Sequence, residues 1–267
     1  DLFTHSAQED HRLYTKDGLM RIKLCCYLLL MSCLGSAQAD LAKLEYLTEE
    51  YPPYNFSDEA GQPSGLAVEL LQMVWQRSGT PAQPIRILPW ARGYYLLTQK
   101  PNVVLFSTAR TDTRDPLFKW ACPIGYSEYI LLAHKQRHIS LSAVEQMNAY
   151  RISAVRADAS EQLLLNRGMD ETRIIPANRL SQALRMLVSG RADLLATSKL
   201  AGYDAIKALQ LKADDFNVAL VLDAEELCYA FSRQVDDGVI KQFQHALTQA
   251  LASPEFQRLR LQYLPAP

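Results

Sequence analysis

The segment VVLFSTARTDTRDPLFKWACPI, residues 103–124, decides both the fold and the site of this chain. It opens with an apolar run, 103–107, which is typical of a β-strand in a sheet covered on both faces. A polar turn follows, in which Pro116 argues against a long helix. In that turn, the guanidinium of Arg114 can grip a carboxylate through two parallel hydrogen bonds, and the hydroxyl of Thr111 can add another. The sequence therefore predicts a small-anion site directly after a buried strand.

The charge balance bounds the kind of partner. The chain has 267 residues and a formal net charge of −1, and residues 40–267 carry the same net charge. No basic run is interleaved with aromatic residues, so we expect neither nucleic acid nor an anionic membrane surface as a partner. His134, His138 and His245 lack metal-ligand spacing, and we expect no metal and no cofactor.

The N-terminal residues are interpreted as lying outside the fold. Residues 20–39 are typical of a secretory signal peptide, with a short basic start, an apolar stretch too short to span a bilayer and a small-residue cleavage site at 37–39. This predicts a periplasmic protein. A lipoprotein anchored at Cys33 is the alternative. Residues 1–19 are interpreted as an upstream extension.

Strand and helix patterns alternate along residues 40–267, which predicts an α/β fold with a mainly parallel sheet. That length suits one large domain or two lobes of about a hundred residues each. The expected strands are 44–48, 84–88, 103–107, 151–155, 193–197 and 217–222. The expected helices are 65–78, 90–98, 160–166, 180–190, 240–251 and 254–263.

Three motifs in this order together resemble the bacterial extracellular solute-binding proteins, family 3, the polar amino-acid type of ABC transporter binding protein. The resemblance covers residues 44–264. The motifs are YPPYNF and SGLAVEL within 51–70, the Thr-x-x-Arg turn with Phe118 and Pro123 downstream, and SGRADLLAT at 189–197.

The resemblance implies a periplasmic-binding-protein-like (type II) fold, in which two α/β lobes are joined by two hinge strands and the ligand cleft lies between the lobes. Lobe 1 would comprise residues 40–128 and 231–267, and lobe 2 residues 129–230. The extended segments 127–133 and 227–232 are expected to cross between them.

Ligand contacts are implied residue by residue. The aromatic residues of this set are alternatively core residues, and Asp158 is alternatively an ordinary helix N-cap. Arg110, in the same turn as Arg114, is assigned to structure. The candidate ligand-binding residues are Arg114, Thr111, Tyr51, Tyr54, Trp90, Ser107, Asp158, Ser160 and Ser198.

The chain departs from the family pattern at Ser198, where relatives usually carry an acidic residue that holds the ligand's α-ammonium. A serine cannot supply that counter-charge, although Glu49, Glu50 or Asp158 could restore it. The ligand is therefore predicted only as a small carboxylate-bearing polar solute. An amino acid, a modified amino acid, an organic acid and a short peptide-like molecule all remain open.

Cys122 and Cys228 are the two cysteines outside the N-terminal segment. An oxidising compartment favours a disulfide between them, and the resemblance places both near the crossing segments. Such a bridge would stabilise the fold by about 4 kcal/mol. We expect two buried free thiols instead, because nothing in the sequence shows that their Cα atoms are close enough.

The function implied is ligand binding by hinge closure and delivery to an inner-membrane ABC permease, by a monomer that is not an enzyme. A second hypothesis is a periplasmic enzyme that resembles cyclohexadienyl dehydratases, with Glu49, Glu50, Glu69 and Asp158 as candidate acids. A third is a sensory ligand-binding module.

Overall fold

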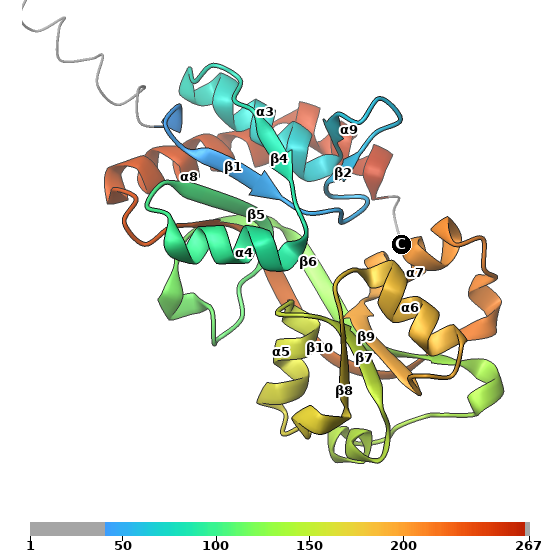
Figure 1. The fold of residues 1–267 in the computed structure, drawn as a ribbon. Coiled ribbons are helices and arrows are strands. Elements are labelled where there is room, and N and C mark those ends of the chain that lie inside the picture. Colours follow the sequence, from blue (N-terminus) through green and yellow to red (C-terminus); the bar gives the residue numbers. More distant parts are fainter. Residues whose placement is uncertain (1–40, 265–267) are drawn as a thin grey trace, which may run out of the picture.

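A computed structural model describes residues 41–264, which form two α/β lobes joined by two long strands (Figure 1). The predicted signal peptide, the lipoprotein alternative and the upstream extension fall on residues 1–40, outside the described residues. Within 41–264, no helix has both the length and the apolar character that crossing a membrane requires.

The elements follow the chain in the order lobe 1, lobe 2, lobe 1. Lobe 1 contains β1 (Glu45–Thr48), β2 (Phe56–Ser57), β3 (Pro63–Ser64), α3 (Leu66–Ser78), β4 (Ile85–Ile87), α4 (Trp90–Gln99), β5 (Val103–Ala109), α8 (Asp237–Leu251) and α9 (Pro254–Tyr263). Lobe 2 contains β7 (Ile152–Val155), α5 (Ala159–Asn166), β8 (Ile174–Ala177), α6 (Leu180–Val188), β9 (Leu194–Ser198) and α7 (Lys199–Ala208). The joining strands are β6 (Lys119–His134) and β10 (Phe216–Phe231).

Strand β5 is buried along its whole length, as its apolar run predicts. Its side chains alternate between two cores, because successive residues of a strand point to opposite faces. Val104 and Phe106 belong to the core that includes α3 and α8, whereas Val103 and Leu105 pack with residues of α4. Helices on both faces therefore hold the end of β5 in place, and the predicted anion-binding turn starts there.

The strands form one sheet in the order β4-β1-β5-β10-β6-β9-β7-β8. The outer pairs are parallel, but β5–β10, β10–β6 and β6–β9 are antiparallel, so the expected mainly parallel sheet is mixed. The reason is that β6 leaves lobe 1 and β10 returns to it. Residues 227–228 and 230–231 pair with β5, and residues 129–132 pair with β9. The division of the lobes at 128 and 230 stays a prediction.

Two elements differ from the expected ones. Helix α7 was not predicted, because its sequence KLAGYDAIKA has small and polar residues in place of an apolar stripe. Strand β10 is continuous where two strands, 217–222 and 227–232, were expected. Asp223, Glu225 and Glu226 break the apolar pattern, yet this stretch pairs with β6 because it lies between the lobes, where side chains remain partly exposed.

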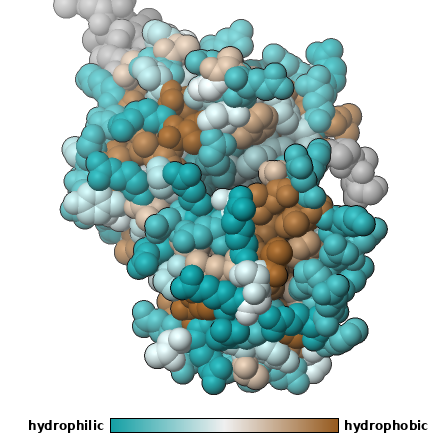
Figure 2. Space-filling model, turned by 45° about the vertical axis from the view of Figure 1, so that its right-hand side comes forward, coloured by the Kyte–Doolittle hydropathy of each residue, from teal (hydrophilic) through white to brown (hydrophobic). Residues whose placement is uncertain are grey.

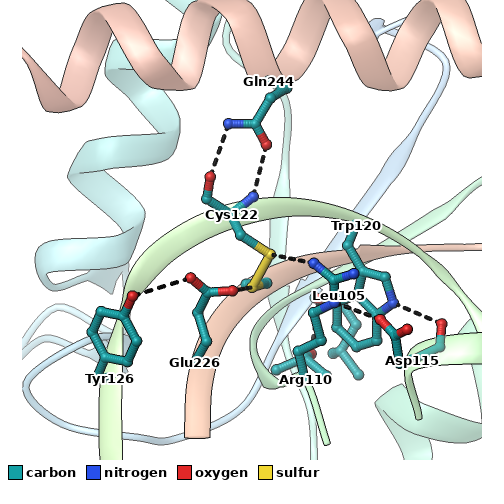
Figure 3. Close-up of a disulfide and its surroundings, with 10 residues drawn as sticks. Leu105, Arg110, Asp115, Trp120, Cys122, Tyr126, Glu226 and Gln244 are labelled. Atoms are coloured by element: carbon teal, nitrogen blue, oxygen red, sulfur yellow. Dashed lines mark hydrogen bonds and ion pairs between the residues drawn. A yellow bond between two sulfur atoms is a disulfide. The ribbon is translucent and has the colours of Figure 1, made fainter. Parts of the chain in front are cut away.

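The expectation of free thiols is wrong. Cys122 and Cys228 form a disulfide, with a Cα–Cα distance of 4.7 Å. The pairing of Tyr229 with Ala121 sets the two cysteines opposite each other on β10 and β6. Gln244 of α8 holds the backbone on the Cys122 side, donating to the Cys122 carbonyl and accepting from its N–H, both at 2.8 Å (Figure 3). The bridge therefore joins the two crossing strands at their lobe 1 ends.

Candidate functional site

A cavity of about 550 Å³ lies between the lobes. Lobe 1 lines it with the loops after β1 and β4, the start of α4 and the end of β5. Lobe 2 contributes the starts of α5 and α6 and one side of α7. Strand ends and helix starts converge here, which is where ligands bind in open α/β sheets.

Arg114 lines this cavity and is only 1% exposed. Its Nη1 donates to the carbonyl of Ala109 at 3.3 Å and its Nη2 to the carbonyl of Ala157 at 3.1 Å. Its Cζ lies 4.9 Å from the ring centre of Trp90 and 5.3 Å from that of Tyr94. These contacts fix the plane of the guanidinium, since stacking on aromatic faces is a preferred arrangement for arginine.

The guanidinium of Arg114 has N–H donors that remain available to an anion. Its two hydrogen bonds take two of five N–H donors, and its buried Nε has no partner. Among the described residues no carboxylate forms an ion pair with it. A buried charge without a carboxylate in direct contact is costly, so this site favours an anion from outside the chain.

The lobes touch each other across the cavity. The carbonyl of Ala157 in lobe 2 accepts from Arg114 and also from Trp90 Nε1, at 2.6 Å. Ala157 has φ 61°, a left-handed conformation that costs a non-glycine residue energy and is found at functional sites. A further contact between the lobes joins Thr111 Oγ1 to Gln162 Oε1 at 3.0 Å. The structure is therefore in a closed arrangement.

Two acids lie near Arg114 in the cavity wall. The Glu49 carboxylate is half-buried and makes no hydrogen bond or ion pair within the described residues. Burial, reinforced by the charge of Asp158, raises the pKa of Glu49 to about 8, although Arg114 opposes this rise. Burial also raises the pKa of Asp158 to about 6, against its hydrogen bonds from the Glu161 N–H and the Ser160 hydroxyl.

The raised pKa of Glu49 predicts a pH-dependent effect of Glu49→Gln on stability. Below its ordinary pKa of 4.5, Glu49 is protonated in both the folded and the unfolded protein, and its burial costs no ionisation energy. As the pH rises from 4.5 towards about 8, the unfolded chain ionises first, so the free energy of unfolding falls. The variant should therefore gain stability relative to the parent over that interval, by roughly 1–2 kcal/mol at pH 8 after allowance for partial exposure. Thermal melts at pH 4.5, 6 and 8 measure this difference, and a difference that does not change with pH contradicts it.

The structure brings six of the nine sequence-predicted residues into the cavity wall. These are Arg114, Tyr51, Trp90, Ser107, Asp158 and Ser198. The other three lie outside it. Thr111 is buried in the Gln162 contact, Tyr54 is a core residue whose hydroxyl donates to the Tyr126 carbonyl, and Ser160 donates to the Asp158 carboxylate behind the wall. The alternative interpretation of Tyr54 as a core residue therefore applies. Asp158 is the N-cap of α5, as its alternative interpretation states, and it also lines the cavity.

Other predicted residues have local roles as well. The hydroxyl of Tyr51 lies 2.7 Å from Ser127 Oγ on β6, and Ser107 donates to Asn55 Oδ1. Ser198 caps α7 by accepting from a backbone N–H at 3.3 Å. Arg110 makes an ion pair with Asp115 and does not line the cavity, in agreement with its assignment to structure.

Sequence reasoning missed the apolar part of the wall. Ala201, Ala205 and Ala208 on α7 all line the cavity, together with Leu180 and Leu88. The alanines recur after four and three residues, a spacing that puts them on one helix side and was available as a signal. This spacing indicates a shared helix side only if residues 199–208 are helical, and the sequence pattern does not predict that helix.

A cavity between two α/β lobes joined by two crossing strands defines a two-lobed solute-binding protein. Residues 46–266 match the bacterial extracellular solute-binding proteins, family 3, and the chain belongs to that family. A probable amino-acid ABC transporter-binding protein from Haemophilus influenzae is 26% identical over 162 residues, which are 59% of this chain and 60% of that relative.

Solved structures share the fold. A histidine kinase sensor domain with similarity to periplasmic binding proteins superposes with a TM-score of 0.75 at 20% identity, covering 85% of this chain and 98% of the domain. An ABC uptake transporter substrate-binding protein from Streptococcus pneumoniae with bound histidine has a TM-score of 0.74 at 16% identity, with 87% and 96% covered. At these identities the likeness extends to the fold alone.

Proposed function

We propose that this chain binds a small carboxylate-bearing polar solute, an amino acid or a related compound, between its lobes. The observation that carries the proposal is Arg114, a buried cation in the cavity wall with an unpartnered Nε and no ion pair to a carboxylate within the described residues. A carboxylate can accept two parallel hydrogen bonds from such a group. Neither a neutral sugar nor a simple cation would offset its charge.

Glu49 and Asp158 extend the proposal to the ligand's ammonium group. Both line the cavity near Arg114, and the Glu49 carboxylate is unpartnered among the described residues. Asp158 of lobe 2, whose pKa is raised only to about 6, is mostly ionised at neutral pH and supplies the negative charge that Ser198 lacks. Glu49 of lobe 1, with a pKa raised to about 8, offers a carbonyl oxygen that an ammonium can donate to. A ligand carrying both a carboxylate and an ammonium therefore suits the site better than an organic acid.

Hinge closure is the proposed mechanism. The wall draws on both lobes, so a ligand in the cavity interacts with the two lobes together only when they are closed, and it stabilises that state by the difference. As the family and the Haemophilus relative suggest, we propose a periplasmic monomer that delivers its ligand to an ABC permease.

A binding screen tests the proposed function. Thermal melts of the purified protein with amino acids, organic acids and short peptides should show a rise in melting temperature for carboxylate-bearing solutes, because a ligand that binds only the folded state stabilises it. Matched amides, in which the carboxylate is neutralised, should give no rise. If no solute of these classes raises the melting temperature, or if amides act as well as acids, the proposal is contradicted.

An enzyme is the second candidate, favoured by one observation. With a pKa raised to about 8, Glu49 is mostly protonated at neutral pH and is able to donate a proton inside the cavity. To test for this enzyme activity, the protein is incubated with cyclohexadienyl acids and the mixture is analysed for the dehydrated products. Turnover that disappears in Glu49→Gln supports the enzyme, whereas stable binding without turnover supports the binding protein.

A further inference from the structure

We propose that the ligand carries a bulky apolar body, which lies along α7 in the part of the cavity away from Arg114. This inference rests on the proposed binding function and adds the chemistry of the ligand's other end. We call this part of the cavity the apolar arm. Its walls are Leu180, Ala201, Ala205 and Leu209 of lobe 2 and Ile87 and Leu88 of lobe 1.

The apolar arm is open because small side chains line the cavity side of α7. Ala201 and Ala205 face the cavity from α7, whereas Ile206, one residue further on, is buried in the lobe 2 core. A methyl side chain at the cavity positions leaves room that a leucine would fill. The packing of Ile206 into the lobe 2 core holds α7 in place on its other side.

The size of the cavity exceeds what a polar head group needs. A water-sized group takes about 30 Å³ in the liquid, so the cavity of about 550 Å³ is many times larger than a single such group. A carboxylate, an ammonium and the carbon between them amount to only about five non-hydrogen atoms, each comparable in size to a water. The aliphatic side chains of the arm bound part of the remaining volume.

The polarity of the wall is divided accordingly. Arg114 and Asp158 supply charges for the head group, and the Glu49 carboxyl lies in the same wall. Arg179 and Asp204 also line the cavity, and burial raises the pKa of Asp204, but both keep contact with solvent. They suit a water-exposed rim. In Figure 2, apolar surface (brown) gathers between the two halves of the molecule on the side of α6 and α7, bordered by hydrophilic residues.

Titration calorimetry with two homologous series tests the arm. The probes are alanine, 2-aminobutyrate, norvaline and norleucine, and in parallel the straight-chain acids from propionate to hexanoate. Each added methylene should tighten binding about fourfold while the arm fills, because burying a methylene in an apolar site is favourable. Affinity that stays flat along the series, or that is higher for glutamine and arginine than for norleucine, overturns the apolar arm.

A variant that fills the arm separates the two proposals. Ala205→Trp should weaken norleucine at least tenfold and alanine much less. Leu200→Trp, on the same helix but exposed and outside the cavity, should change neither. Thermal melts check that the variants fold. If Ala205→Trp does not fold, Ala208→Phe, at the exposed end of α7, is tested in its place. Equal weakening of both probes, or of neither, contradicts the arm alone. If the parent protein binds no carboxylate solute at all, the proposed function itself is contradicted.

Discussion

Arg114→Ala should weaken binding of the best carboxylate solute at least tenfold, and up to about a hundredfold. A hydrogen bond to a charged group is worth about 1.5–3 kcal/mol when the site is dry, and each 1.4 kcal/mol is a factor of ten in affinity. Arg114 is 1% exposed and already oriented by Trp90 and Tyr94, so little entropy is lost when a ligand engages it. Titration calorimetry of the parent and the variant measures the change.

The matched control for this experiment is Arg110→Ala. Arg110 lies in the same turn, but its guanidinium pairs with Asp115 at 2.6 Å at the surface and does not line the cavity. Its loss should leave affinity within about twofold, since exposed ion pairs contribute little. Arg114→Lys keeps the charge without the planar fork and should bind at an intermediate level. A folded Arg114→Ala protein with parental affinity would remove Arg114 from the site.

Replacing both Cys122 and Cys228 by serine should lower the free energy of unfolding by about 3–4 kcal/mol. The bridge spans a sequence separation of 106 residues, and in the chain-entropy model a loop of this length restricts the unfolded chain strongly. For a chain of this size, each 1 kcal/mol shifts the melting temperature by about 2–4 °C, so the expected fall is on the order of 10 °C.

Thermal melts of three samples measure the effect of the bridge. The parent under reducing conditions should melt with the double serine variant, because both lack the bridge, and the oxidised parent should melt well above them. The serine hydroxyls replace sulfur at a partly buried and a buried position, so the reduced parent is the cleaner comparison. An oxidised parent that melts with the other two would show that the bridge does not stabilise the fold.

Ligand affinity of the bridge variant is a separate readout. The disulfide holds β6 and β10 together near their lobe 1 ends, outside the cavity wall. Affinity measured well below the melting temperature should therefore change by less than stability does.

Some structural features were readable from particular residues. The apolar run 103–107 required a strand covered on both faces, and Val104 and Leu105 now lie in different cores. The turn that follows placed Arg114 at a strand end. Gly79 adopts φ 68° at the end of α3, where the sequence pattern had ended a helix. Each of these inferences depended on neighbours in sequence, for which residue type and spacing carry the information.

Other features needed contacts between distant segments. Glu49 was one of several acids until the fold placed it in the cavity near Asp158, which is 109 positions away in the sequence. Whether Thr111 and Tyr54 line the cavity depended on where lobe 2 and β6 lie, and neither does. The partner of Cys122 depended on the register of β10 against β6.

The sequence by itself therefore determined the alternation of strands and helices, the family and the position of the anchoring arginine, because these follow from periodicity and local motifs. Only the tertiary structure decided whether the two cysteines are bridged, which acids lie near Arg114 and that an apolar arm extends along α7. The physical reason is that burial, pKa and cavity shape are set by groups from both lobes that come together only when the two crossing strands pair.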